Sequence, residues 1–255
     1  MKKTFVWMIC IFGVIAITPS AQAFEVGIRG YYWFPTLNGD IKMDSSGLIG
    51  TTLDLKNDLG FEDEHYPIVE AFVGLGNHHL SLSYYSADYS ATKELSTDIT
   101  FKDKIYTAKD IINSSLEYDI YDIMYQYDLL DLENILAGFS LGIIGKVKII
   151  NGDVEIKSTT LTKSASEDFT LPIPMVGGNF HLGIIADLLE ARLKVSGISY
   201  GDGTIFDGQA DISLTPFPFV DIHGGYQIFL IDLDIDGEKF NYNTSGPYIA
   251  LTLSY

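Results

Sequence analysis

Cysteine is nearly absent from this chain, and basic residues are scarce. The only cysteine is Cys10, so disulfide bonds and thiolate metal sites are excluded from everything that follows it. Lys and Arg total 16 against 34 Asp and Glu, which gives a formal net charge of −18. So acidic a surface disfavours nucleic acid and anionic membrane surfaces as partners and suits divalent cations or basic partners.

Long apolar runs are also missing after the first 23 residues. The longest candidate, ILAGFSLGIIG at 135–145, is too short to cross a bilayer as a helix. The first 23 residues combine Lys2 and Lys3, an apolar stretch and a terminal Ala-Gln-Ala, which predicts a secretory signal peptide over 1–23. Because Cys10 lies inside the apolar stretch, we expect no lipid attachment. The expected mature chain, 24–255, forms one domain of charge −20 (−18 minus 2 for the two lysines).

The chain is nevertheless rich in apolar and aromatic residues that alternate along it. Hydrophobic residues make up 47%, and 16 Tyr and 15 Phe are present. The last ten residues, GPYIALTLSY, alternate apolar with small or polar side chains, and this period of two predicts a strand with two unlike faces. Similar stretches predict ten strands, at about 24–36, 65–76, 79–91, 114–127, 135–149, 174–187, 190–200, 207–215, 219–235 and 246–255.

The connections between these strands alternate in length. The gaps 37–64, 92–113 and 150–173 are long, whereas 76–79 and 128–134 are short. This alternation with an even strand count predicts a transmembrane antiparallel up-and-down β-barrel. Both termini are expected at the rim that has the short connections. We expect ten strands; eight or twelve remain open, because 37–64 and 92–113 have room for further strands.

The nature of the two strand faces indicates the surroundings of the barrel. The face opposite the apolar one is charged, glycine-rich and sparse, and an exported chain without a spanning helix can cross lipid only as a closed barrel. Aromatic residues cluster near strand ends, as in interfacial girdles, and we place Tyr32, Trp33 and Tyr255 at the membrane boundary. The alternation slips at 228–231, which predicts a β-bulge.

Several stretches, in this order, resemble a poorly characterised family of Gram-negative outer-membrane β-barrel proteins. They are LDLKNDLGF (53–61), HHLSLSYY (78–85), ITFKDKIYT (99–107), YDIMYQYDLL (121–130), LPIPMVGGNF (171–180), GGYQIFL (224–230) and GPYIALTLSY (246–255). The resemblance spans nearly the whole of 24–255. It implies a barrel in the outer membrane, placed there by the barrel assembly machinery in contact with lipid and lipopolysaccharide, and it brings no reaction and no cofactor.

Charged residues on the polar face of the predicted strands are the main candidates for function. A lumen lined by them selects ions or small polar solutes in one interpretation. In the other, they pair across a narrow barrel and fill it, because only far wider barrels leave an aqueous channel. The candidates are Glu25, Arg29, Glu70, Glu117, Asp119, Asp122, Lys146, Lys148, His181, Arg192, Lys194, Asp211, Asp221 and His223.

The long acidic segments and the histidines give the alternatives. Segment 37–64 is dense in carboxylates that suit calcium or magnesium, although it has no calcium-loop motif and we assign no metal ligand. His65, beside Asp63 and Glu64, is the histidine expected at the outer rim, where Ser45 or Ser46 is available as a nucleophile. We therefore expect a structural or narrow-channel barrel first, a surface-binding barrel that recognises a partner or lipopolysaccharide second, and a rim hydrolase third. No catalytic residue is assigned.

Overall fold

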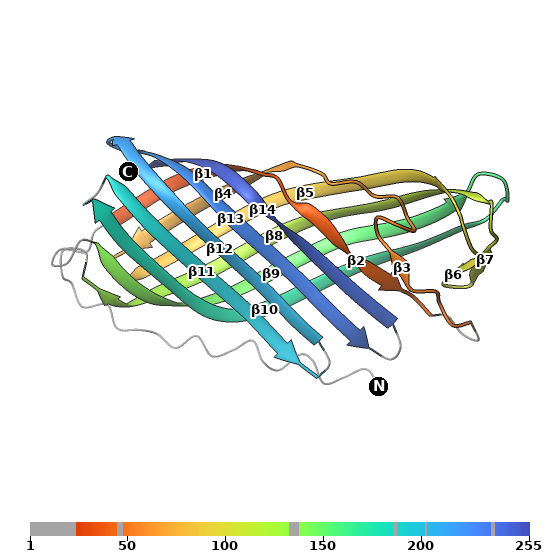
Figure 1. Ribbon diagram of the computed structural model, residues 1–255. Helices are drawn as coiled ribbons and strands as arrows, with labels where there is room; N and C mark the ends of the chain where they lie inside the picture. Colours follow the sequence, from red (N-terminus) through yellow and green to blue (C-terminus); the bar gives the residue numbers. More distant parts are fainter. Residues whose placement is uncertain (1–23, 45–47, 133–137, 186–187, 202, 236–237) are drawn as a thin grey trace.

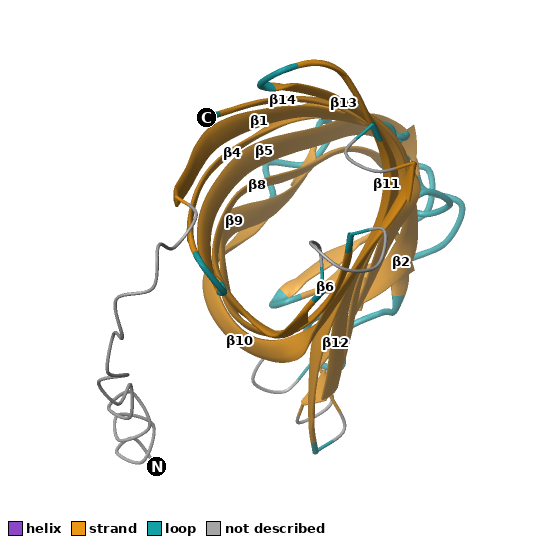
Figure 2. Ribbon diagram, turned by 90° about the vertical axis from the view of Figure 1, so that its left-hand side faces the viewer, coloured by secondary structure: helices purple, strands orange, loops and turns teal. Residues whose placement is uncertain are grey.

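The protein is a closed antiparallel β-barrel in the computed structural model, which describes residues 24–44, 48–132, 138–185, 188–201, 203–235 and 238–255 (Figures 1 and 2). No helix in these residues is long and apolar enough to cross a membrane. The strands are β1 (Phe24–Trp33), β2 (Thr36–Lys42), β3 (Leu53–Asp54), β4 (Tyr66–Leu75), β5 (His78–Glu94), β6 (Ile99–Phe101), β7 (Lys104–Tyr106), β8 (Ile111–Asp131), β9 (Phe139–Ser158), β10 (Ser164–Ile185), β11 (Leu189–Tyr200), β12 (Gly203–Phe217), β13 (Val220–Ile235) and β14 (Glu238–Ser254).

Ten of these strands form the barrel wall. They are β1, β4, β5 and β8 to β14, each paired with the next, and β1 pairs with β14 to close the ring. The prediction of a ten-stranded antiparallel barrel is therefore confirmed. Both ends of the wall meet at the same rim, where the Val26 amide donates to the carbonyl of Tyr255 and the Tyr255 amide donates to that of Val26.

The closing seam contains a break at Phe34 and Pro35. Below it β1 pairs with residues 248–254 of β14, and above it β2 pairs with residues 239–245 of the same strand. Proline cannot donate a ladder hydrogen bond, which explains why the strand is interrupted there. Opposite the break, a Cβ on Gly246 would stand 2.0 Å from the carbonyl oxygen of Phe34. Glycine at 246 thus permits the close backbone approach that the seam requires.

The wall strands extend further than the sequence indicated. β8, β9 and β10 have 21, 20 and 22 residues, so most of the expected loop 150–173 is strand. In the expected loop 92–113, β5 extends to Glu94 and β8 begins at Ile111. The stretch FKDKIYT contributes to a small hairpin, β6–β7, and segment 37–64 contains β2 and β3. The extra strand lies above the ring as a structure that we call the lobe: β2, β3, β6, β7 and the adjoining halves of β5, β8, β9, β10, β13 and β14 (Figure 1).

The two faces of the wall exchange character where the ring meets the lobe. On β14, Ile249, Leu251 and Leu253 point outward and are about half exposed, whereas Phe240 and Tyr242 point inward. β13 follows the same rule, with Ile222 outward at one end and Ile231 inward at the other. The ring is therefore apolar outside and polar inside, and the lobe is the reverse. The expectation that polar faces look inward along the whole strand is wrong for the lobe, because there water replaces lipid outside.

This exchange also explains the phase slip at 228–231. The predicted bulge is absent: β13 keeps an unbroken register with β12 from Ile222 to Asp232 and with β14 along its length. The inward-facing side chains of β13 change from polar, at His223 and Gln227, to apolar, at Phe229 and Ile231. A change in the surroundings of one regular strand has the same sequence signature as an inserted residue.

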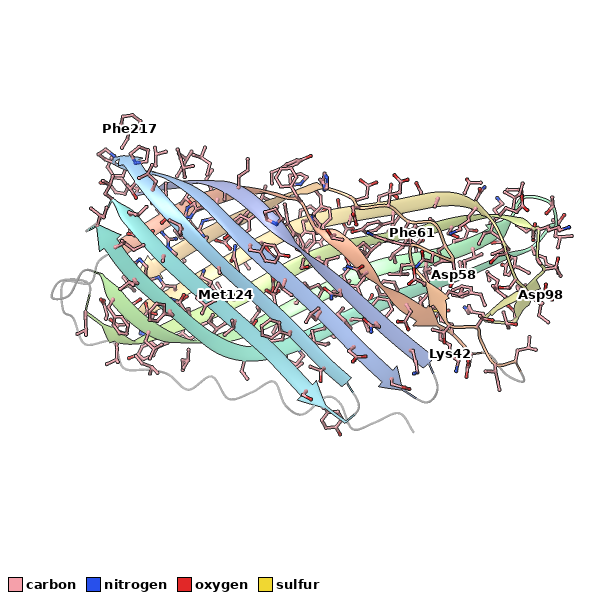
Figure 3. The ribbon with its side chains drawn as sticks, viewed as in Figure 1. Lys42, Asp58, Phe61, Asp98, Met124 and Phe217 are labelled. Atoms are coloured by element: carbon pink, nitrogen blue, oxygen red, sulfur yellow. The ribbon has the colours of Figure 1, made fainter. Side chains whose placement is uncertain are left out.

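The lobe has a hydrophobic core of its own, closed by the segment after β2. Leu53, Leu55, Leu59 and Phe61 are at most 2% exposed and pack with the inward side chains of the upper strands. Figure 3 shows Phe61, Asp58 and Asp98 in the lobe, with Phe217 at the opposite end of the molecule. The acidic segment 48–64 is therefore a folded cap.

Carboxylates of this cap serve as backbone acceptors. Asp63 accepts hydrogen bonds from the Leu37 amide (2.7 Å) and pairs with the Lys56 ammonium (2.7 Å). Burial opposes ionisation of Asp63, but these two donors outweigh it and hold the pKa of the carboxyl below its ordinary value of 3.8. Within the described residues, no group of three or more His, Cys, Asp or Glu side chains is arranged to hold a metal ion. Divalent cations at these segments therefore remain a prediction.

Replacing Asp63 with asparagine is expected to loosen the cap at neutral pH. A depressed carboxylate pKa stabilises the folded state above the unfolded pKa, and this contribution is lost as the pH falls through the folded pKa. The melting temperature of Asp63→Asn should thus lie below that of the wild type at pH 7, and the two should converge in strong acid. Fluorescence of Trp33, the one tryptophan in 24–255, reports the melting. Glu62→Gln, at the exposed neighbouring carboxylate, should match the wild type at every pH.

Candidate functional site in the ring interior

The predicted lumen residues line the inside of the ring, with two exceptions. The structure places on the inner surface Glu25, Arg29, Glu70, Asp122, Lys146, Lys148, His181, Arg192, Lys194, Asp211, Asp221 and His223. These side chains form three successive groups between the short-turn rim and the lobe. Their role in solute selection remains a prediction.

Asp119 and Glu117 are the exceptions, and their placement in the lumen is wrong. Asp119 lies on the outer surface of β8, where its carboxylate accepts a hydrogen bond from the Tyr84 hydroxyl (2.7 Å). It stands three residues from Asp122, which points inward. Side chains an odd number of positions apart occupy opposite faces of a regular strand, so both acids could not face the lumen.

The membrane-boundary prediction is wrong for Trp33 for the same reason. Tyr32 is 44% exposed on the outer surface, whereas its neighbour Trp33 has no exposed surface. The indole N–H of Trp33 donates to the carbonyl of Gly246 (3.1 Å), and its ring packs edge-on against Tyr66 inside the barrel. Tyr255 lies at the other rim, 80% exposed and stacked on Phe219.

A polar cavity of about 300 Å³ occupies the interior next to the short-turn rim. His79 contacts Asp128 (2.9 Å), and Glu190 is bound by Arg192 (2.8 Å) and by His181 (3.3 Å) on the neighbouring strand. Asp128 and Glu190 thus each have a basic partner from an adjacent strand. The cavity walls therefore combine acidic and basic side chains.

A buried network above this cavity has the connectivity of a hydrolase triad. The hydroxyl of Thr252 lies 2.8 Å from His223 Nε2, and His223 Nδ1 lies 3.1 Å from Asp211. Arg29 donates from Nε to the same hydroxyl (2.6 Å), and its Nη1 pairs with Glu70 (3.3 Å). Thr252 and His223 are at most 2% exposed, and neither borders the cavity. A substrate atom has no place beside this hydroxyl, so the geometry is that of a structural network.

Further toward the lobe, four charged side chains meet inside the barrel. Lys148 Nζ lies 2.6 Å from Asp122 and 3.0 Å from Asp207, and Lys146 Nζ lies 3.2 Å and 3.0 Å from the same two acids. The side chain of Lys148 is only 1% exposed. Two ammonium and two carboxylate groups compensate each other, which is the condition for burying charge at tolerable cost. We call this group the charge cluster.

Aromatic rings cover the charge cluster on the lobe side. The Lys148 ammonium lies 4.7 Å from the ring centre of Phe229 and 5.9 Å from that of Tyr85. Tyr85 stacks on Tyr66 with ring centres 5.3 Å apart, and Tyr66 packs against Trp33. Further rings continue this aromatic layer into the core of the lobe. A void of about 60 Å³ remains at the level of the charge cluster.

Several interior residues were missed from the sequence. Asp207 begins the strand expected at 207–215 but was not among the predicted lumen residues, and it faces inward in β12. A signal was present, because 207, 209 and 211 share one face and carry Asp, Gln and Asp. Thr252 and Tyr248 carried no such signal, since a hydroxyl on the non-lipid face of a closing strand is ordinary.

The predicted rim hydrolase is not assembled by the described residues. The ring of His65 packs edge-on against Phe34 on the outer surface. Ser45 and Ser46 lie outside the described residues, so their position relative to His65 is not part of the structure.

Comparison with known proteins relates the chain to outer-membrane barrels at the level of fold. No protein-family profile and no curated protein sequence matches it. Among solved structures, the outer-membrane protease OmpT from Escherichia coli aligns with a TM-score of 0.53 at 8% identity, over 95% of this chain and 99% of that chain. The attachment invasion locus protein Ail of Yersinia pestis, in complex with the heparin analogue sucrose octasulfate, aligns with a TM-score of 0.41 at 10% identity, over 91% and 99%.

The apolar band of the ring agrees with this likeness. Exposed apolar side chains cover the outer surface of every ring strand, and exposed aromatic residues stand at the short-turn rim and at the junction with the lobe. Such a band with aromatic borders is typical of spanning barrels. The chain thus has the fold of the Gram-negative outer-membrane β-barrels, and its ring lies in that membrane.

Proposed function

We propose that this protein is a closed, structural outer-membrane barrel that carries an extracellular lobe and does not conduct ions. The observation that supports this most directly is the charge cluster. Its four groups meet within 3.2 Å across the interior and are covered by the aromatic layer. An ion that passes must break these contacts and then cross an apolar region, where a charge is costly.

The direction of the lobe follows from the lengths of the connections. Bacterial spanning barrels have short periplasmic turns and long extracellular ones. The longest connections between ring strands, 34–65 and 95–110, lie in the lobe, whereas every connection at the rim that bears Phe24 and Tyr255 is short. That rim therefore faces the periplasm in this proposal, and the lobe faces the outside. The lobe is then the part that meets partners, while the ring serves as its anchor.

Conductance in planar lipid bilayers tests the closed barrel. The purified protein, reconstituted at a density at which a general porin gives regular steps, is expected to leave the baseline current flat. Glu70→Ala, which removes the partner of Arg29 in the ring, should also give no steps, because the charge cluster remains. Discrete steps in the wild type whose ion selectivity changes in Glu70→Ala would contradict the proposal and favour the narrow channel.

A further inference from the structure

An apolar cleft of about 160 Å³ lies in the lobe, outside the polar interior already described. Its walls come from β2, β8, β9, β10, β13 and β14, and include Leu116, Phe169, Leu171, Leu233 and Phe240. A smaller apolar void shares four of these side chains and extends toward the core. The side chains of Phe169, Leu171, Leu233 and Phe240 are only partly buried although they pack on the core. An apolar cavity of this size accepts an apolar ligand group.

The barrel wall is interrupted beside this cleft. β11 ends at Tyr200 and β12 begins at Gly203, whereas β10 extends upward to Ser164. In the described residues β10 pairs with β11 only from Val176 onward, so Ser164–Met175 has a strand partner only on the β9 side. Figure 1 shows β11 to β14 ending short of β8 to β10. The gap in the wall lies between the strands that carry Leu171 and Leu233, the two sides of the cleft.

Two lysines border the cleft in a directly opposed pair. Lys42 of β2 and Lys239 of β14 are register partners that border the cleft, although their side chains leave the strand face opposite to that of Ile41 and Phe240. Like charges directly opposite each other on neighbouring strands repel. Lys42 lies 3.3 Å from Asp44, and Lys239 lies 3.5 Å from Asp234, in partly exposed ion pairs that are weak in water. An anion held between the lysines would relieve the repulsion. Figure 3 shows Lys42 at the lower edge of the lobe in that view.

We infer that the cleft binds a single-chain anionic amphiphile of the fatty-acid type. The aliphatic chain enters through the gap in the wall and lies between Leu171 and Leu233, and the carboxylate lies at Lys42 and Lys239. A single chain fits because the cleft is one cavity with apolar walls and its cationic groups are on one side. This inference goes beyond the proposed function and does not depend on it: a conducting ring would contradict that function and leave the cleft in place.

Equilibrium binding of radiolabelled decanoate to the immobilised, detergent-solubilised protein tests the inference. Saturable binding of one decanoate per chain is expected. Leu171→Trp, which fills the cleft, should abolish it, and Leu233→Trp should do so from the opposite wall. Lys42→Gln combined with Lys239→Gln should weaken decanoate binding about tenfold, as expected for two exposed ionic contacts, and leave binding of uncharged decanol unchanged. Lys157→Gln, at an exposed lysine of β9 away from the cleft, is the matched control.

Heat-dependent migration on gels establishes that each variant is folded before binding is measured. Absence of saturable decanoate binding by the wild type overturns the inference, whatever the variants do. So does equal binding by the wild type and by a folded Leu171→Trp or Leu233→Trp variant. Loss of decanoate and decanol binding to the same degree in the double lysine variant overturns the assignment of the carboxylate.

Discussion

Replacement of Lys148 by methionine is expected to lower the free energy of unfolding by about 3 kcal/mol, near the lower end of the range for breaking a buried ion pair. The methionine keeps most of the apolar stem but removes the ammonium that contacts Asp122 and Asp207. Both carboxylates then depend on Lys146 alone, in a site that water does not reach freely. The loss should appear as a lower urea midpoint in lipid vesicles, followed by the fluorescence of Trp33.

Two further variants separate charge from packing at this position. Lys157→Met changes an exposed lysine of the same strand and should shift the midpoint little, because an isolated exposed charge contributes little to stability. Adding Asp207→Asn to Lys148→Met restores the balance of charges and should recover part of the loss. A midpoint for Lys148→Met equal to that of the wild type would show that the charge cluster is not a stabilising element of the ring.

Truncation of Trp33 to alanine is expected to destabilise the barrel by about 3–5 kcal/mol, the range for removing a large buried aromatic side chain. Trp33 has no exposed surface, and it joins the seam to the aromatic layer through Gly246 and Tyr66. Its loss leaves a cavity beside the break in the seam and removes one hydrogen-bond donor from the carbonyl of Gly246. Because the variant lacks the fluorescent reporter, unfolding is followed by far-ultraviolet circular dichroism.

The adjacent residue provides the control. Tyr32→Ala removes an aromatic side chain of similar size from the outer surface, so it should cost less than half as much as Trp33→Ala. Equal losses for the two variants would contradict the placement of Trp33 inside and return it to the membrane boundary predicted from the sequence.

The period of two was sufficient to predict the architecture. Alternation marks a strand whatever its surroundings, so ten strands, their order and the closing role of GPYIALTLSY followed from local pattern. The outward positions of Ile249, Leu251 and Leu253 followed as well, because lipid requires apolar contact over the whole outer surface of the ring. The lengths of the strands could not be predicted from this pattern. In the lobe the strands continue, but their inner face is apolar and their outer face is polar, the reverse of the ring.

The composition of the candidate site was only partly predictable. Lys148 and Asp122 were assigned to the lumen from their phase, and the structure places both there. Their meeting with Asp207 depends on the curvature that brings β12 opposite β8 and β9, which no local pattern records. The errors at Asp119 and Trp33 share one cause: near the junction both faces of a strand carry polar and aromatic residues, so residue type does not indicate which face is inside.

By itself, then, the sequence determined a ten-stranded antiparallel wall with an apolar belt, because backbone pairing and lipid contact act on each strand separately. Only the tertiary structure decided what fills that wall: the charge cluster, the aromatic layer and the apolar cleft of the lobe. Those groups come from strands far apart in the chain, and their contacts exist only once ring closure between β1 and β14 has fixed every strand opposite its distant partners.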